Sequence, residues 1–498
     1  MGLTRYLRAG SGMRNLPASH PLRHMDELTF LPATKMAELV RRKEISPVEL
    51  VQAHLARAQA LQPKLNAFAT LDTQRALDQA RAAEAALAKA GPAGARRDPL
   101  HGVPVTIKSA IDVQGLVCAA GSALRRTHLP REDAPLVARL RAAGAIVLGN
   151  TNVPECLMAY ETNNVLYGAT SNPWDLARTA GGSSGGEAAA IAAGCSAGGV
   201  GSDGGGSIRV PAHFCGICGL KPTPGRIPGT GHFPPGGGAF GWIGVVGPLA
   251  RTVGDLRLLF EAMAGPDPGD ALSAPVAVLH TDEEELRGLR IGLLESEALG
   301  QTTPETQAAV KRAGQALAEQ DFAVEPMRLD GLGRALELWW FFFVRAIGYL
   351  LREASAGEES KLSPMLREYL QVSAAEPPIT LDEFIGACVE RDVCRAAILR
   401  QMETAPILLS PVSASPAFRH GEGTWRAGKS LPPYQETMRH SQWLNLAGLP
   451  GAVVPVGASP EGLPIGVQII GRPHEEELVL AVAECIERAC GGWHRPPL

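Results

Sequence analysis

The sequence predicts an α/β protein: one large domain with a central twisted sheet, mixed but largely parallel, that helices cover on both faces. Short runs rich in β-branched residues alternate with helical segments along the 498 residues, which is typical of this class. Several of these runs are apolar throughout, as expected of strands buried on both faces. Hydrophobic residues make up 45% of the chain and charged residues 20%, which is enough apolar material for a large core.

The first elements are helices between residues 34 and 90. Ser46 precedes Pro47 and is followed three residues later by Glu49, so Ser46 is predicted to cap a helix that begins at Pro47. The alanine-rich segment 73–90 is a further helix, which Gly-Pro at 91–92 ends. Residues 102–107 form a short β-branched run, which predicts a strand that carries Lys108 at its end.

The same alternation continues to the C-terminus. Helices are predicted at residues 133–143, 187–193, 304–320 and 475–488, and strands at 145–148, 290–294, 322–324, 407–409, 452–456 and 466–470. The Gly- and Pro-rich stretch 222–248 is predicted to be a long loop. The chain has no internal repeat and no linker-like tract, so residues 31–498 form one predicted catalytic domain, preceded by an extension at 1–30.

Charge and residue usage exclude several classes of protein. The net charge is −4, so no basic face for nucleic acid is expected. The longest apolar run, 338–351, is interrupted by Arg345 and is too short to span a bilayer. The N-terminus has arginines but no apolar signal-peptide stretch. We therefore expect a soluble, cytoplasmic protein with no membrane span.

Cysteine and histidine spacing gives no sign of a metal or redox centre. Nine cysteines in a long chain favour a reducing compartment over a disulfide framework. Cys215 and Cys218 form a C-x-x-C without a second pair, and we expect two buried structural thiols. The twelve histidines show no metal-ligand spacing. No metal and no cofactor are therefore predicted.

Two glycine-serine loops are the most informative feature of the chain. Residues 181–186 read GGSSGG, and residues 201–211 read GSDGGGSIRVP. Glycine is used where the backbone takes a positive φ or comes very close to another group. Two such loops predict a site where backbone N–H groups point at a phosphate, a cofactor or a carbonyl under attack.

A nucleotide-binding function is disfavoured. Residues 199–204 match G-x-G-x-x-G, which in dinucleotide-binding proteins follows a strand and opens a helix. Here residues 207–211 are predicted to be extended and then broken by Pro211. The chain also has no G-x-x-x-x-G-K-[ST] phosphate loop.

An α/β-hydrolase elbow is also disfavoured. Residues 182–186 match G-x-S-x-G, with Ser184 at the nucleophile position. That motif needs a buried strand directly before it, whereas residues 172–180 are polar and contain a proline. His494, at the extreme C-terminus, is a poor candidate for the required base.

The loops and their surroundings resemble a known family. The chain is similar to the amidase signature family at residues 102–108, 172–175, 181–186, 203–209, 215–223, 247–252 and 445–472. Residues 215–223 look especially like the fatty acid amide hydrolase branch. The departures are modest, with Gly204 in place of a larger residue, Ser109 in place of an acidic one and Ala180 in place of proline.

The resemblance implies a catalytic set. It makes Ser207 the nucleophile, Ser183 a bridging serine preceded by a cis peptide bond, and Lys108 the base. Ser183 follows Lys108 by 75 residues, and Ser207 follows Ser183 by 24. The backbone N–H groups of Gly204, Gly205, Gly206 and Ser207 would form an oxyanion hole. Ser184, Asp203 and Arg209 would support the loops.

This chemistry requires a neutral lysine. At the ordinary pKa of about 10.4, only about one lysine in 2,500 is neutral at pH 7. Burial can lower that pKa to about 7, and Lys108 ends an apolar strand. Ser207 would then pass its proton to Ser183, and Ser183 would pass its own proton to Lys108.

The expected substrate is a small-molecule carboxamide with a hydrophobic acyl or aryl part, with esters or carbamates as side substrates. Leu157, Met158 and Tyr160 would line the acyl pocket in the resembled family. The aromatic run 338–344 is either a buried core helix or a lid over an apolar channel. The alternative function is the glutaminase subunit of a tRNA-dependent amidotransferase. The oligomeric state is open, and a homodimer is one option.

Overall fold

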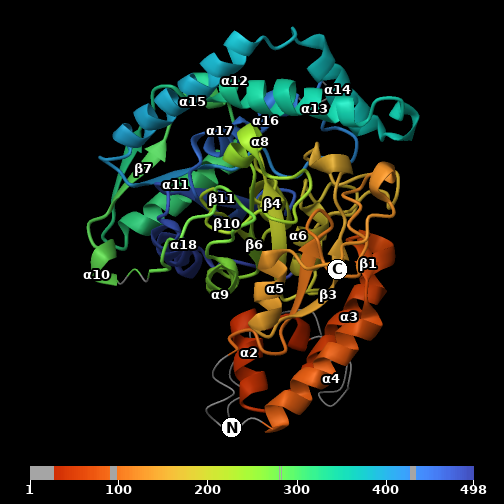
Figure 1. The fold of residues 1–498 in the computed structure, drawn as a ribbon. Coiled ribbons are helices and arrows are strands. Elements are labelled where there is room, and N and C mark those ends of the chain that lie inside the picture. The colour runs from red at the N-terminus through yellow and green to blue at the C-terminus, as the bar shows by residue number, and fades with distance from the viewer. Residues whose placement is uncertain (1–26, 90–97, 280, 282, 427–432) are drawn as a thin grey trace.

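The computed structural model describes residues 27–89, 98–279, 281, 283–426 and 433–498. In this part of the chain, strands form one eleven-stranded sheet (Figure 1). The strands are β1 (Phe68–Leu71), β2 (Pro104–Lys108), β3 (Ile146–Thr151), β4 (Gly198–Asp203), β5 (Cys218–Lys221), β6 (Val245–Ala250), β7 (Arg290–Leu294), β8 (Ala323–Met327), β9 (Ile407–Pro411), β10 (Gly451–Ala458) and β11 (Pro464–Ile470).

The α-helices of the described residues vary from one to almost six turns. They are α2 (Ala33–Arg41), α3 (Pro47–Leu65), α4 (Thr73–Lys89), α5 (Pro135–Ala142), α6 (Gly185–Ala192), α7 (Arg209–Cys215), α8 (Gly238–Ile243), α9 (Val253–Met263), α10 (Glu283–Leu286), α11 (Pro304–Ala318), α12 (Leu332–Trp340), α13 (Ile347–Ala354), α14 (Pro364–Ala375), α15 (Leu381–Gln401), α16 (Tyr434–Thr437), α17 (Arg439–Ala447) and α18 (Glu476–Cys490). A π-helical turn, Phe341–Ala346, joins α12 to α13.

The predicted elements are present, with ends that differ by a few residues. Helix α3 begins at Pro47, and Ser46 and Glu49 form the expected capping box. Strand β2 carries Lys108 as its last residue. The end of the predicted helix at 73–90, together with Gly91 and Pro92, lies outside the described residues, as does most of the extension at 1–30.

The sheet is mixed, as predicted, but its parallel pairs are in the minority. The strand order is β1-β3-β2-β4-β6-β5-β10-β11-β9-β7-β8. Four neighbouring pairs are parallel, in the blocks β3-β2-β4 and β9-β7-β8. The other six are antiparallel. The expectation of a largely parallel sheet is therefore wrong in this respect. The sequence interpretation had missed β1, which lies within the segment 34–90 that was expected to be helical, as well as β4, β5 and β6. Strand β6 runs antiparallel to both of its neighbours.

Two segments differ from their predicted conformation. The stretch 222–248 includes α8 and the start of β6. Residues 207–211, predicted to be extended, lead into α7, in whose first turn Pro211 lies. Proline is tolerated there because the first N–H groups of a helix have no intrahelical acceptor. Residues 199–204 lie largely within β4 and so cannot form a loop that follows a strand.

Each face of the sheet has its own apolar core. Along β10, Val453 faces the cluster that contains residues of α6, α7 and α17. Its neighbours Ala452 and Val454 face the cluster that contains residues of α9, α11 and α18. This alternation follows from the two-residue period of a strand. Helices therefore cover both faces, as predicted.

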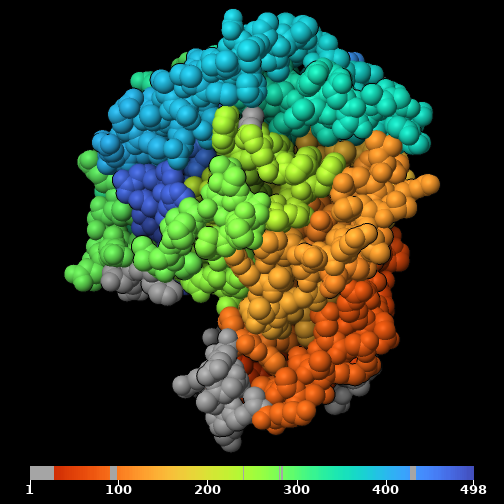
Figure 2. Space-filling model, viewed as in Figure 1, coloured from red at the N-terminus to blue at the C-terminus, as the bar shows by residue number. Residues whose placement is uncertain are grey.

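Residues 332–401 form a separate layer at one end of the molecule. Helices α12 to α15 lie together across the top of the view, next to α8 (Figures 1 and 2). No helix among the described residues is both long enough and apolar enough to cross a membrane.

Candidate active site

Lys108 lies at the centre of the candidate site, at the C-terminal end of β2. Its side chain is fully buried. Its Nζ donates hydrogen bonds to Ser183 Oγ at 2.7 Å, Ser184 Oγ at 2.9 Å and the Ser202 carbonyl oxygen at 3.2 Å. The ammonium or amine group is therefore held by three oxygens from two loops that the sequence had singled out.

The environment of Lys108 favours the neutral amine. Burial lowers the pKa of Lys108 to about 7, against the smaller opposing effects of the Asp203 and Glu187 carboxyl groups. Near pH 7, about half of the Lys108 side chains therefore carry no proton. This is the value that general-base chemistry at Lys108 requires.

Ser183 and Ser184 lie in the tight loop that enters α6. The peptide bond between Gly182 and Ser183 is cis. A side chain at Gly182 would place its Cβ 2.6 Å from the Ala159 carbonyl oxygen, so the loop requires glycine there. Ser184 accepts a hydrogen bond from Lys108 and donates one to the Ser202 carbonyl at 3.3 Å. Ser184 therefore helps to fix the lysine.

Ser207 lies across the same cavity, just before α7. It is half-buried, and with Ser183 it lines the cavity. Its carbonyl oxygen accepts a hydrogen bond from the Ser184 N–H at 3.1 Å. Among the described residues, no hydrogen bond joins the Ser207 hydroxyl to that of Ser183. The structure thus brings Lys108 and Ser183 into contact and places Ser207 beside them.

The loop 204–207 offers fewer free N–H groups than the sequence suggested. The Gly206 N–H donates to Asp203 Oδ1 at 2.7 Å, so it is not available to an oxyanion. The N–H groups of Gly204, Gly205 and Ser207 have no acceptor in the described part of the protein. Gly206 has a φ of 124°, a conformation that favours glycine. We therefore correct the expected donor set by removing Gly206.

Two aromatic residues donate hydrogen bonds to backbone carbonyls of this loop. Trp339 Nε1 donates to the Gly204 carbonyl at 2.8 Å, and the Tyr160 hydroxyl donates to the Gly205 carbonyl at 2.7 Å. A Cβ at Gly205 would lie 2.5 Å from the Trp339 ring and 2.8 Å from the Tyr160 hydroxyl. Both carbonyls are therefore fixed, and with them the direction of the adjacent peptide groups. Tyr160 had been expected in the substrate pocket, but it lies beneath the loop.

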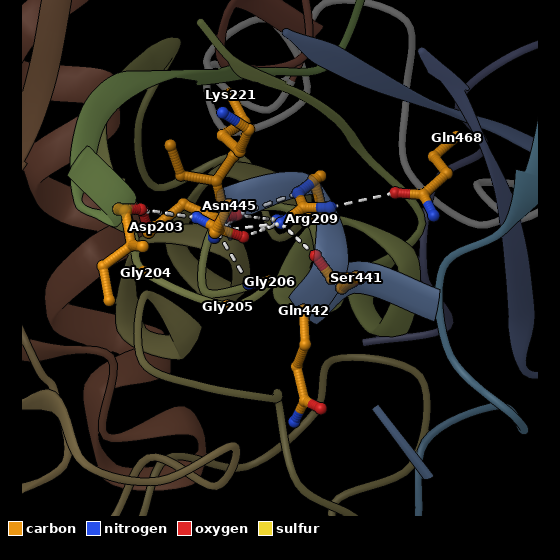
Figure 3. Close-up of polar contacts among 12 residues, drawn as sticks. Asp203, Gly204, Gly205, Gly206, Arg209, Lys221, Ser441, Gln442, Asn445 and Gln468 are labelled. Atoms are coloured by element: carbon orange, nitrogen blue, oxygen red, sulfur yellow. Dashed lines mark hydrogen bonds and ion pairs between the residues drawn. The ribbon is translucent and has the colours of Figure 1, made fainter. Parts of the chain in front are cut away.

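A buried ion pair anchors the loop at its base (Figure 3). The Arg209 guanidinium donates to both carboxylate oxygens of Asp203, at 3.0 and 3.1 Å. It also donates to Asn445 Oδ1 at 2.6 Å and to Gln468 Oε1 at 3.0 Å. Burial is the largest single effect and would raise the pKa of Asp203. The charge and hydrogen bonds of Arg209, together with the Lys221 charge and the Ile208 N–H, outweigh it and hold that pKa well below its usual range. Asp203 and Arg209 thus form the expected scaffold, completed by Asn445 and Gln468.

The comparisons with known proteins show the family to which the chain belongs. The family model described as Amidase matches residues 49–480. The chain belongs to the amidase family. It is 36% identical to a glutamyl-tRNA(Gln) amidotransferase subunit of Roseiflexus castenholzii (strain DSM 13941 / HLO8), over 94% of this chain and 98% of the relative.

Solved structures of several amidases have the same fold. The structure of 6-aminohexanoate cyclic dimer hydrolase in complex with its substrate has a TM-score of 0.81 and 29% identity, and the match covers 94% of this chain and 99% of that one. A bacterial aryl acylamidase of the amidase signature family has a TM-score of 0.80 and 26% identity, over 93% of this chain and 97% of that one.

The resemblance to the fatty acid amide hydrolase branch does not hold at the level of the whole chain. A fatty acid amide hydrolase structure has a TM-score of 0.82 but only 22% identity, over 96% of this chain and 91% of that one. That likeness shows the fold alone. The amidotransferase relative is more similar in sequence. The chain therefore belongs to the amidase family but is not assigned to the fatty acid amide hydrolase branch.

The cavity of this amidase is mostly apolar. Leu157 and Met158 line it, as expected for the acyl pocket. The other large apolar side chains in the lining are Ile227, Phe240, Trp242, Leu272 and Phe343. The cavity encloses about 130 Å³, close to the engineered cavity of about 150 Å³ that binds benzene. Its size therefore suits one aromatic ring or a short acyl chain.

The aromatic run 338–344 serves two purposes that the sequence could not separate. Trp339 is fully buried and belongs to the core beneath the loop 204–207. Phe343 stacks on Trp339 with ring centres 4.6 Å apart and also lines the cavity. Trp339 thus supports the core interpretation, and Phe343 is a buried residue that also forms part of the cavity wall.

The remaining residues of interest are the two cysteines of the C-x-x-C motif and a histidine of the cavity lining. Cys215 and Cys218 are buried, and burial raises the pKa of the Cys218 thiol well above its usual value. Their thiols contact backbone carbonyls, those of Ala180 and Arg251. His232, which the sequence interpretation did not select, lines the cavity with the two serines. Its only sequence signal was its place in the Gly- and Pro-rich stretch.

Proposed function

We propose that this amidase hydrolyses carboxamides with a small apolar aryl or short acyl group, with Ser207 as nucleophile, Ser183 as proton bridge and Lys108 as base. The contact between the buried Lys108 Nζ and Ser183 Oγ, 2.7 Å long, carries the proposal. It lies in the wall of the cavity that Ser207 also lines. A neutral amine in that position can accept a proton through Ser183.

The proposed reaction forms an acyl-enzyme. When substrate binds, the Ser207 hydroxyl turns toward Ser183, since hydrogen bonds in empty sites often tighten only in the complex. Ser207 Oγ then attacks the carbonyl carbon while its proton passes to Ser183 and the Ser183 proton passes to Lys108. Ser183 returns a proton to the leaving nitrogen as the C–N bond breaks. Water, activated by the same relay, then hydrolyses the ester and regenerates Ser207.

The negative charge on the tetrahedral oxygen would be bound by backbone N–H groups. Gly204, Gly205 and Ser207 supply the donors without an acceptor in the described part of the protein. Removing one donor from such a site typically costs about 3 to 4 kcal/mol in the transition state. A tetrahedral intermediate also forms from esters and carbamates, which we therefore expect to be slower side substrates.

Glutamine hydrolysis is the second candidate, because the relative from Roseiflexus castenholzii belongs to a glutamyl-tRNA(Gln) amidotransferase. Glutamine carries an α-carboxylate, which a buried site usually pairs with a cation. The described cavity lining includes Asp203, His232 and Asp270 but no lysine or arginine. A described lining without a cation favours a neutral, apolar amide over an amino acid as the substrate.

The test is a substrate screen on the purified full chain. We expect benzamide and short aliphatic amides to be hydrolysed with higher kcat/KM than a long-chain amide or L-glutamine. Lys108→Ala and Ser207→Ala should each reduce kcat at least about a thousandfold. A fluorophosphonate probe should label Ser207 in the unsubstituted protein and should not label Ser207→Ala. Near-normal turnover by Lys108→Ala would overturn the relay, and a clear preference for glutamine would overturn the substrate class.

A further inference from the structure

His232 has one ring nitrogen bound to the protein and the other free. Its Nδ1 lies 2.9 Å from the Pro234 carbonyl oxygen. A carbonyl oxygen can only accept, so Nδ1 carries the hydrogen. In the neutral ring, Nε2 then presents a lone pair. Nε2 is buried and has no hydrogen-bond partner in the described part of the protein.

The imidazole is neutral at ordinary pH. Burial lowers the pKa of His232 to about 4, and the Lys108 charge acts in the same direction. The Pro234 carbonyl opposes this effect without reversing it. Nε2 is therefore an acceptor and not a donor near pH 7.

The backbone around His232 is held along the segment that follows Lys108. The Asp112 N–H donates to the Gly231 carbonyl and the Phe233 N–H donates to the Ala110 carbonyl, both at 2.8 Å. His232 pairs with Ile111 in an antiparallel bridge. The ring therefore has a fixed position beside residues 110–112, which follow Lys108 in the chain.

The other titratable groups of the described lining are already engaged. Asp203 binds Arg209. The Asp270 carboxylate accepts from the Gly229 N–H at 2.8 Å and from the Leu272 N–H at 2.9 Å. His232 therefore differs from both carboxylates, because it lines the cavity and its Nε2 has no hydrogen-bond partner in the described part of the chain.

We propose that His232 Nε2 accepts a hydrogen bond from a hydroxyl or amino group on the apolar part of the substrate, and so selects aryl or acyl amides that carry such a donor. This inference rests on the proposed function. His232 lines the same cavity as Ser207, and the proposal assigns the donor to the part of the substrate beyond the amide that is cleaved. A methoxy group has no hydrogen to donate, and a carboxylate would set its lone pairs against that of Nε2. Both are therefore poor partners.

The experiment compares hydroxybenzamides with methoxybenzamides, substituted at ring positions 2, 3 and 4. At the best position, the unsubstituted protein should prefer the hydroxyl compound by about tenfold or more in kcat/KM, as expected of one hydrogen bond to a buried acceptor. His232→Leu should reduce that preference to about twofold or less. His232→Gln, which keeps an acceptor oxygen, should retain part of it.

His54 supplies a matched control. Its Nδ1 lies 2.9 Å from the Leu50 carbonyl oxygen and its Nε2 is buried without a partner in the described structure, but it lies on α3 and does not line the cavity. His54→Leu should therefore keep the hydroxyl preference, whatever it does to Tm. Labelling of Ser207 by a fluorophosphonate shows whether each variant retains a folded site.

The outcomes separate the two proposals. If the unsubstituted protein hydrolyses none of the benzamides and the probe does not label Ser207, the proposed function is wrong and this inference falls with it. If the benzamides are hydrolysed but no ring position shows a hydroxyl preference, the role of His232 alone is wrong. A preference that survives in a folded His232→Leu variant also overturns it. If His232→Leu does not fold, His232→Gln decides the question: a reduced preference with Ser207 still labelled supports the role of His232, and an unchanged preference overturns it.

Discussion

Lys108 Nζ lies 2.7 Å from Ser183 Oγ although 75 residues separate them in the chain. Strand β2 ends at this point, and the loop before α6 meets it inside the protein. The contact has no exposed side, since both residues are buried. It therefore joins an amine to a hydroxyl at a buried point in the wall of the cavity.

The pH profile of hydrolysis should report Lys108. The neutral amine is the form that accepts a proton, and its pKa is about 7. We expect kcat/KM to rise about tenfold per pH unit below that value and to level off above it, because kcat/KM reports the free enzyme. The measurement is kcat/KM for benzamide from pH 5 to pH 9. A profile that falls through pH 7 would contradict an amine base.

Substituting Lys108 should stabilise the protein while it abolishes activity. The pKa of Lys108 is lowered from 10.5 to about 7 by burial, so between these values the unfolded chain binds more protons than the folded protein and stability rises with pH. The destabilisation by Lys108 is fully present below pH 7. The gain from Lys108→Met in the free energy of unfolding should therefore be about 3 kcal/mol larger at pH 6 than at pH 9.

Urea denaturation at the two pH values measures this difference. Lys64, which is exposed at the end of α3, supplies the control. Lys64→Met should give the same change at pH 6 and pH 9. Equal gains from Lys108→Met at both pH values would show that the folded protein holds Lys108 at its ordinary pKa.

Trp339→Phe should impair turnover more than substrate binding. The substitution keeps a ring in the core but removes the Nε1 donor to the Gly204 carbonyl. An unsatisfied buried carbonyl costs about 1 to 3 kcal/mol, and the oxyanion donors next to it lose their fixed direction. We expect kcat to fall about tenfold or more, with little change in KM.

Trp340→Phe is the matched control for that variant. The Trp340 indole donates to the Glu376 carboxylate at 3.0 Å, in the layer formed by residues 332–401 and away from Gly204. It should leave kcat within about twofold of the unsubstituted value. Equal losses in both variants would mean that this layer matters only for packing.

Arg209→Met should be strongly destabilising. It leaves the buried Asp203 carboxylate without its guanidinium partner, and breaking a buried pair from one side typically costs about 3 to 5 kcal/mol. Adding Asp203→Asn should recover part of that loss, because the unpaired charge is then removed. Urea denaturation of both variants checks the order of stabilities. A double variant less stable than Arg209→Met would contradict this account.

Local signals predicted much of the fold, and the resemblance to the amidase signature family indicated the residues of the candidate site. Apolar periodicity and capping residues gave the position of α3 and of β2 with Lys108 at its end. Glycine-rich central strands were the main failure, because β4, with the sequence GGVGSD, has almost no side chains from which to read a pattern. Its glycines are required by packing. A Cβ at Gly201 would lie 2.7 Å from Ser184 Oγ.

The roles of Tyr160, Gly206 and His232 could not be read from their local sequence. Tyr160 was assigned to the pocket, yet its hydroxyl supports Gly205. Gly206 was counted as an oxyanion donor, yet Asp203 takes its N–H. His232 was not selected, and it lies in a stretch predicted to be a loop. The role of each residue depends on its hydrogen bonds, and the geometry of these bonds depends on how the chain folds back on itself.

By itself, the sequence determined which chemical groups are present and where they lie along the chain: a lysine at a strand end, two glycine-serine loops and the Asp203–Arg209 pair. These follow from residue type and local periodicity. Only the tertiary structure decided that the lysine is buried against Ser183, which N–H groups of the loop are free, and which residues shape the cavity. The physical reason is that desolvation and hydrogen-bond direction arise between segments as distant as β2, α6, α12 and α17, whose contacts no local pattern encodes.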